Sequence, residues 1–127
     1  MYVCGVKKEL TKAEEQIMHA LWRIKKGFAK DILESLKEPK PAYNTVLTVV
    51  RVLVDKKYIA FNTYGKSNEY YPTISKADYS SWKLQILKKN YFSNSSKELV
   101  SFFVKDNKMD LSELDEILTL LKNEKND

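Results

Sequence analysis

The chain has 127 residues, of which 43% are hydrophobic and 31% charged, and it carries a net charge of +5. This size and composition predict one globular, helix-rich domain, alone or with a small appendage. With Cys4 as the single cysteine and no apolar run long enough to cross a bilayer, the sequence argues against an internal disulfide framework, a cysteine-cluster metal site and membrane insertion.

The positive charge is confined to the first part of the chain. Residues 1–73 contain 13 Lys/Arg and 8 Asp/Glu, whereas residues 74–127 contain nine of each. A basic balance on one segment favours a polyanionic partner, with DNA as the first candidate, although many soluble domains reach this charge without binding nucleic acid. Because the N-terminus lacks the pattern of a signal peptide, we expect a cytoplasmic protein.

Residues 1–8 are expected to form a short N-terminal tail, after which the first helix begins. Thr11 and Glu14 have the spacing of a capping box, in which each side chain accepts a backbone N–H of the first turn. Leu10, just before the cap, can act as a hydrophobic staple. Apolar residues then recur at helical spacing, and Gly27 is expected to end the helix in a left-handed conformation.

A second, shorter helix is predicted for residues 28–37, with its apolar side chains turned inward. Pro39 and Pro41 follow, and two prolines in three residues break the helix and predict a stiff, extended connector. This order of helix, short helix and tight connector leads into a third helical pattern over residues 42–57, as in a helix-turn-helix.

The third pattern has an apolar face and a polar face. The apolar positions, spaced i, i+3, i+4 and i+7, are Val46, Val49, Val50 and Leu53. The polar face carries Asn44, Thr45, Thr48 and Arg51. Such a helix can enter a DNA major groove, offering side chains to base edges and its N-terminal N–H groups to phosphate. Taken alone, the same pattern fits an ordinary amphipathic helix with a solvated outer face.

The next segment of the chain favours a DNA-binding helix over an ordinary amphipathic one. Residues 58–64 alternate with a two-residue period and predict a strand, residues 65–68 a turn, and residues 69–71 a second strand. A hairpin after a third helix is typical of the wing of a winged helix, and its tip carries Lys66, within reach of a phosphate. The fold expected over residues 9–73 is a winged helix-turn-helix with a two-stranded wing that binds DNA.

Residues 74–127 predict three further helices joined by short polar loops, which makes the fold class mainly α, with an α+β winged helix. Their apolar stripes contain Trp82, Ile86, Leu99, Phe102, Phe103, Leu114, Ile117, Leu118 and Leu121. About fifty residues cannot bury this surface among themselves, so we expect a dimerisation domain that packs against a second copy. The alternative is packing against the winged helix of the same chain. A dimer would place two reading helices roughly 34 Å apart, a spacing suited to an inverted-repeat operator.

Four segments of the chain are similar to the penicillinase repressors, the winged-helix repressors of bacterial β-lactamase and methicillin-resistance genes. They are LTKAEEQIMHALW, AYNTVLTVVRVLVDKKYI, GKSNEYYPTISKADY and LVSFFV with DLSELDEILTLL, and the likeness runs over residues 9–124. The resemblance implies a homodimer that binds an inverted repeat in double-stranded DNA and blocks transcription. It further implies relief of repression when a membrane-bound sensor metallopeptidase leads to cleavage of the repressor.

The resemblance also assigns roles to individual residues. It implies base reading by Asn44, Thr45, Thr48 and Arg51 and a wing contact by Lys66. The basic residue that many members place one position later corresponds here to Val52, while Arg51 supplies the charge. The scissile bond maps onto Phe102–Phe103, where better-known members carry asparagine on the first side; the alternative for both phenylalanines is a place in the dimer core.

Two functional classes are alternatives to a repressor. One is a winged helix that serves as a protein-interaction module without sequence-specific DNA binding. The other is an enzyme, which the sequence argues against because it lacks a glycine-rich phosphate loop, a clustered carboxylate pair and a second histidine beside His19. We therefore expect no cofactor and no metal, and the missing C-terminal Cys-x-Cys pairs argue against copper sensing.

Overall fold

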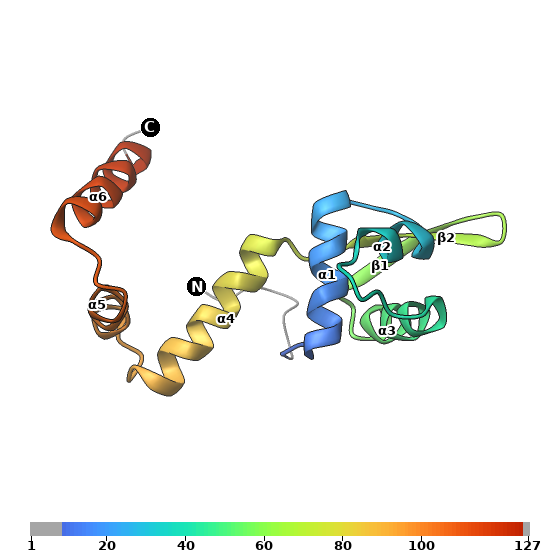
Figure 1. Ribbon diagram of the computed structural model, residues 1–127, viewed down its shortest axis with the longest axis horizontal. Helices are drawn as coiled ribbons and strands as arrows, with labels where there is room; N and C mark the ends of the chain where they lie inside the picture. Colours follow the sequence, from blue (N-terminus) through green and yellow to red (C-terminus); the bar gives the residue numbers. More distant parts are fainter. Residues whose placement is uncertain (1–8, 126–127) are drawn as a thin grey trace. The chain divides into compact units, whose positions relative to one another are not determined.

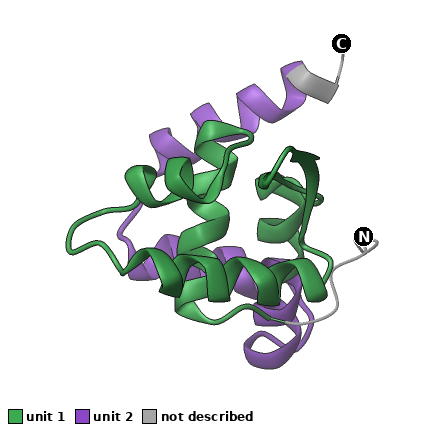
Figure 2. Cartoon of the chain, turned by 90° about the vertical axis from the view of Figure 1, so that its right-hand side faces the viewer, with its two compact units in different colours: residues 1–83 green, residues 84–127 purple. Residues whose placement is uncertain are grey.

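The computed structural model describes residues 9–125, so the predicted tail over residues 1–8 lies outside the described residues. Its elements in chain order are α1 (Lys12–Ile24), α2 (Ala29–Ser35), α3 (Tyr43–Asp55), β1 (Ile59–Tyr64), β2 (Ser67–Pro72), α4 (Lys76–Tyr91), α5 (Ser96–Asp106) and α6 (Leu111–Lys125), as Figure 1 shows. Three helices, a two-stranded antiparallel wing and three more helices confirm the predicted mainly α fold with a winged helix. The chain divides into two compact units, residues 1–83 and 84–127 (Figure 2).

The capping box predicted at the start of α1 is confirmed. The Thr11 backbone N–H donates to Glu14 Oε1 at 2.8 Å, and the Glu14 N–H donates to Thr11 Oγ1 at 3.2 Å. These bonds satisfy two of the four N–H groups that a helix start leaves without partners. The two sequence signals three residues apart therefore located the helix start correctly.

The predicted end of α1 at Gly27 is wrong. The helix ends at Ile24, and the positive φ after it, 76°, belongs to Lys25. Gly27 instead pairs with Tyr70 of β2, donating its N–H at 2.9 Å and accepting the Tyr70 N–H at 2.8 Å. A Cβ at position 27 would lie 2.9 Å from both the Asp31 Cβ and the Ile24 side chain, so close packing, rather than a positive φ, requires glycine there.

The core of the first unit is assembled from α1, α2, α3 and the base of the wing. Its fully shielded side chains are Met18, Ala20, Leu21, Ile32, Val46, Val50 and Leu53. Burying one side chain of this kind contributes roughly 1.5–3 kcal/mol relative to exposure. All the extensive contacts between described elements involve these three helices and the two strands. This core holds α3 against α1, α2 and β1.

The wing is a tighter hairpin than the sequence predicted. The register pairs Tyr64 with Ser67 and Thr63 with Asn68, which leaves a two-residue loop of Gly65 and Lys66. Gly65 has φ 63°, the left-handed conformation that glycine adopts without strain and that two-residue hairpin loops require. The predicted turn over residues 65–68 is therefore two residues too long, because strand pairing extends to the loop.

Helix α4 begins at a cap formed by Ser75, whose Oγ accepts the Asp78 N–H at 3.0 Å. Its first turns belong to the first unit, where Tyr79 is buried and Trp82 packs against the core. The Trp22 indole N–H also donates to the Ile74 carbonyl at 2.9 Å. The compact units divide α4 after Lys83, ten residues beyond the predicted domain boundary at 73.

The second unit contains the end of α4, α5 and α6. The Ser95 Oγ accepts the Glu98 N–H at 3.1 Å at the start of α5, and Asp110 Oδ1 accepts the Glu113 N–H at 2.8 Å at the start of α6. Phe92 and Phe102 have ring centroids 5.4 Å apart. Among residues 84–123, whose side chains the structure describes, every residue is exposed or half-buried. This unit has helices but no core of its own.

Candidate nucleic-acid interface

The two faces of α3 differ as the sequence predicted. Val46, Val50 and Leu53 have no exposed surface and pack in the core. The four predicted reading residues, Asn44, Thr45, Thr48 and Arg51, are all exposed. Because the core residues lie on one side of the helix, the polar residues are held on the opposite side in a fixed order.

The N-terminus of α3 has no side-chain cap. The residue before the helix is Ala42, which has no side-chain oxygen, and the first intrahelical bond runs from the Val46 N–H to the Ala42 carbonyl at 3.1 Å. The N–H groups of the first turn therefore have no internal acceptor. Backbone N–H groups at a helix start, with the positive end of the helix dipole, suit an anionic partner such as a phosphate.

Thr48 has a defined hydrogen-bonding direction. Its hydroxyl donates to the Asn44 carbonyl at 2.9 Å within α3, so the hydroxyl hydrogen is already engaged. The oxygen lone pairs and the methyl group remain for a partner. Thr48 can therefore accept a hydrogen bond from an amino group or contact a methyl group, both of which the major groove offers.

A hollow of about 570 Å³ brings together residues from α2, α3 and the wing. Its lining includes the basic side chains Lys30, Arg51 and Lys66, together with Tyr43 and Asn68. Arg51 and Lys66, predicted separately from the helix and the wing, thus line one concave surface. Sequence reasoning missed Lys30 and Tyr43, because a helical-face argument treats each helix alone and the hollow exists only once the elements pack.

The hollow is lined by three basic side chains and one acidic side chain, Asp31, so its charged groups are mostly basic. Among the described residues, the acidic partners of ion pairs are Glu9, Glu14 and Glu15, which pair with Lys56 or Lys83. None of these pairs involves a basic residue of the hollow. The positive charge of the α3 and wing surface is therefore not neutralised by the salt bridges of the described part of the chain, which favours a polyanion.

The two glutamates of α1 are held in their charged form. Burial alone would raise the pKa of Glu14, but the Thr11 N–H and the Lys56 ammonium outweigh it and lower the pKa below its usual range. Burial alone would also raise the pKa of Glu15, but the Lys83 ammonium and the Tyr79 hydroxyl outweigh this effect and lower that pKa. Burial and the Glu15 carboxylate raise the pKa of the Tyr79 phenol, which stays protonated.

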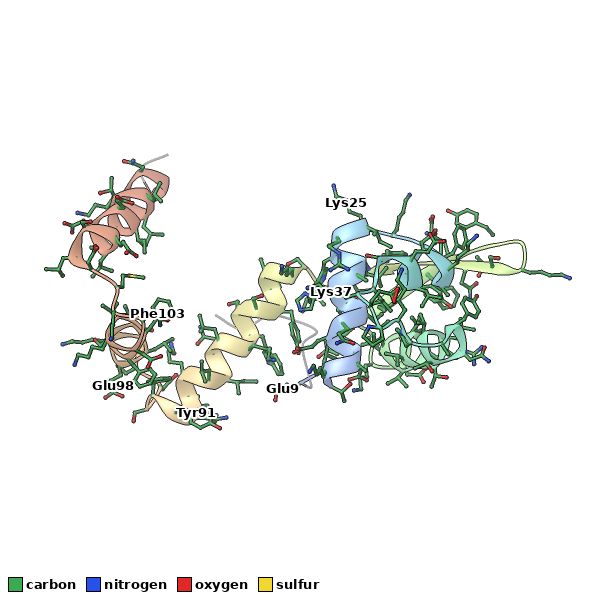
Figure 3. All side chains as sticks on the ribbon, viewed as in Figure 1. Glu9, Lys25, Lys37, Tyr91, Glu98 and Phe103 are labelled. Atoms are coloured by element: carbon green, nitrogen blue, oxygen red, sulfur yellow. The ribbon has the colours of Figure 1, made fainter. Side chains whose placement is uncertain are left out.

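The residues predicted for dimerisation fall into three groups. Phe102, Phe103, Ile117, Leu118 and Leu121 are exposed, between 41% and 57%. Ile86, Leu99 and Leu114 are half-buried. Trp82 lies in the first unit, with its ring 5.8 Å from that of Tyr79. In Figure 3 the Phe103 side chain is on α5, and α5 has no buried residue.

The described residues contain no group of three His, Cys, Asp or Glu side chains that could hold a metal ion. His19 is exposed and contacts Trp22 edge to face, with ring centroids 5.3 Å apart. No helix in the described part of the chain is long and apolar enough to cross a membrane.

Comparison with known proteins identifies the family. The family model described as penicillinase repressor matches residues 10–123, nearly the whole chain. A search of curated proteins gave no match. A structure reported for the regulation of DNA binding of Bordetella bronchiseptica BpsR by 6-hydroxynicotinic acid is 16% identical, with a TM-score of 0.49, covering 95% of this chain and 78% of that one. The chain therefore belongs to the penicillinase repressor family, whose members are DNA-binding transcriptional repressors and not enzymes.

Proposed function

We propose that this repressor acts in the cytoplasm as a homodimer whose two α3 helices read an inverted repeat in double-stranded DNA. The observation that carries the proposal is the division of α3, which has three fully buried apolar residues on one side and exposed Asn44, Thr45, Thr48 and Arg51 on the other. The buried and exposed residues thus lie on opposite faces of the helix. A helix held by its apolar face can enter a major groove with its polar side chains toward the bases.

The chemistry of the four side chains suits base edges. A guanidinium such as that of Arg51 can donate two hydrogen bonds to guanine, and an amide such as that of Asn44 can form a paired contact with adenine. Thr48, whose hydroxyl hydrogen is engaged by the Asn44 carbonyl, accepts from an amino group or contacts a thymine methyl. Thr45, near the start of the helix, lies among the N–H groups suited to a phosphate.

The wing contributes affinity rather than sequence reading in this proposal. Lys66 occupies one of the two loop positions at the tip of the hairpin, and no ion pair of the described residues holds it. It also lines the same hollow as Arg51 and Lys30. An ammonium at this place suits a phosphate of the DNA backbone, which positions the protein without carrying sequence information.

The second unit supports a dimer. It has no buried residue between residues 84 and 123, although it contains large apolar side chains that are about half exposed, such as Phe102 at 57% and Leu121 at 54%. Exposed apolar area of this kind is unusual on a monomer and marks an interface. Closed two-fold symmetry is the commonest assembly of identical chains, and it would pair two α3 helices with two half-sites.

Release of the operator by proteolysis is the second part of the proposal. The Phe102–Phe103 bond lies inside α5, so a sensor metallopeptidase or a protease that it activates could cut it only after the helix unwinds. In a single protomer unwinding costs little, because α5 has 11 residues and buries none of them, whereas in the proposed dimer the burial of Phe102 and Phe103 would oppose it. Cleavage would separate α6 from the rest of the chain and remove part of the proposed dimer surface.

The proposal is tested by measuring assembly and DNA selection on the full chain. Sedimentation at micromolar concentration is expected to give a dimer, and duplexes selected from a random pool are expected to contain two half-sites one helical turn apart. A monomer at this concentration, or equal affinity for every duplex, would contradict the proposal.

The release step needs its own measurement. Co-expression with a membrane-spanning zinc peptidase of the sensor class is expected to yield a fragment that ends at Phe102, detectable by intact mass. Fragments that end elsewhere would reject this bond and leave both phenylalanines as interface residues.

A further inference from the structure

Two adjacent glutamates on α1 pair with lysines from different elements. Glu14 pairs with Lys56, which caps the C-terminus of α3, and Glu15 pairs with Lys83 of α4. Glu14 is 5% exposed and is the one charged residue that is buried in the described part of the chain. Both of its carboxylate oxygens lie 2.9 Å from the Lys56 Nζ. The Glu14 pair thus connects α1 to the end of α3, whereas the Glu15 pair connects α1 to α4.

Lys56 lies where the reading helix passes into the wing. Its N–H donates to the Val52 carbonyl at 2.9 Å and closes the last turn of α3. Lys57 then takes a left-handed conformation, with φ 70°, and β1 begins at Ile59. A bond that holds the Lys56 side chain therefore acts on the C-terminal end of α3 and on the base of the wing together.

The other end of this bond is also fixed. The Glu14 carboxylate accepts the Thr11 N–H at 2.8 Å in addition to the Lys56 ammonium, so its position is set by the first turn of α1. A buried ion pair contributes little net stability, because removing two charges from water offsets their attraction. Geometry is the property that such a pair can specify, since the Thr11 N–H holds the Glu14 carboxylate and both oxygens of that carboxylate hold the Lys56 ammonium.

We propose that Glu14 and Lys56 are positioning residues that set the angle of α3 and the wing relative to α1, and thereby the affinity for operator DNA, without contacting DNA. This inference rests on the proposed function, in which α3 reads the bases. Because the Glu14 carboxylate neutralises it, the Lys56 ammonium does not add to the attraction for phosphate. Lys56 is in this respect unlike Lys66, whose charge no carboxylate of the described residues neutralises.

The experiment compares Glu14→Gln with Glu15→Gln in the full-length protein. Glutamine keeps one oxygen for the Thr11 N–H in the first variant, but it removes the charge and replaces the second oxygen that accepts from Lys56 with an NH2 group. Glu14→Gln is expected to weaken binding to a selected operator about tenfold, whereas Glu15→Gln, which loosens only the contact with α4, leaves it unchanged. Lys56→Met should lose as much operator affinity as Glu14→Gln and keep the salt dependence of the wild-type protein. Lys56→Arg, which keeps the charge, should retain most of the wild-type affinity.

Two results would overturn the inference. Equal losses in Glu14→Gln and Glu15→Gln would reduce both pairs to general support of the fold. A salt slope that falls by about one unit in Lys56→Met would instead make Lys56 a phosphate contact. If Glu14→Gln fails to fold, Lys56→Met and Lys56→Arg are compared instead, by their operator affinity and by the salt slope of binding.

A readout that does not use DNA separates this inference from the proposed function. If the wild-type protein shows no operator preference, the proposed function fails, and amide hydrogen exchange then tests the positioning role. Faster exchange at the N–H groups of Lys56 and Tyr58 in Glu14→Gln, but not in Glu15→Gln, supports it. Equal exchange in both variants rejects it.

Discussion

The two units of this chain reach stability by different routes. Among residues 9–83, the first unit buries fifteen hydrophobic residues in one core that holds α1, α2, α3 and the base of the wing. The second unit, over the part whose side chains are described, buries none, although its helices are capped and carry apolar stripes. Local signals are thus enough to form helices, whereas a core needs several elements that pack together, and we propose that a second copy supplies them for the second unit.

The largest expected effect tests the first unit. Leu53→Ala should lower the free energy of unfolding by about 2–5 kcal/mol, because the Leu53 side chain is fully buried and the substitution leaves a cavity. Chemical denaturation measures this. Leu120→Ala, at a position that is 66% exposed, is the control and should change the unfolding of the first unit little. Similar losses in both would contradict the division between the units.

The next effect tests the second unit. Phe103→Asp should weaken dimerisation by tenfold or more, about 1.4 kcal/mol, because it places a charge in the proposed interface. Sedimentation equilibrium measures the change, and circular dichroism should show the first unit still folded. Ser101→Asp, at an exposed position of the same helix, introduces the same charge and is the control. An unchanged association constant in Phe103→Asp would remove this surface from the interface.

Arg51→Ala tests the exposed face of α3. It should cost about 1–3 kcal/mol in affinity for a selected operator, the range of a paired base contact, and much less on random duplexes. Gel-shift titration on the two kinds of DNA measures the difference. An equal loss on both would make Arg51 a phosphate contact instead of a reader of bases.

Lys66→Ala tests the tip of the wing. It should weaken binding to all duplexes alike and lower the slope of log affinity against log salt by about one unit, as expected for one lost phosphate contact. Fluorescence anisotropy at several salt concentrations measures the slope. An unchanged slope would show that the wing tip does not contact the DNA backbone.

The smallest effect at neutral pH concerns the ion pairs of α1. The pKa values of Glu14 and Glu15 are lowered in the folded state, so their pairs stabilise the fold above the ordinary glutamate pKa of about 4.3 and lose this effect as the pH falls through the lowered values. Unfolding at a series of pH values should therefore show a flat region above about pH 5 and a decline below about 4.3. A decline that is already complete above pH 5 would contradict this.

Local signals predicted much of the fold. The Thr11 and Glu14 spacing located α1, the apolar spacing in α3 identified its buried face, and the two-residue alternation identified the wing. Each of these depends on neighbours within a few residues of the chain. Penicillinase-repressor motifs in the sequence pointed to the family before the fold was known.

Contacts between residues far apart in the sequence could not be predicted from local spacing. The pairing of Gly27 with Tyr70 and the ion pair of Glu14 with Lys56 join residues about forty positions apart. The hollow that brings Lys30 beside Arg51 and Lys66 likewise depends on how three elements pack. A single sequence carries no spacing rule for such contacts, which is why the true end of α1 and the full basic surface were missed.

The two-residue loop of the wing has a consequence for how related repressors can diverge. Inserting one residue at this tip would require either a different loop type or a shift of the strand register, and a one-residue shift turns the side chains of one strand to the opposite face. Changes of length at this tip are therefore costly, whereas replacing the side chain at position 66 leaves the backbone intact. We expect repressors with this hairpin to change their affinity for DNA at the tip by substitution of residues, while the number of residues in the loop stays constant.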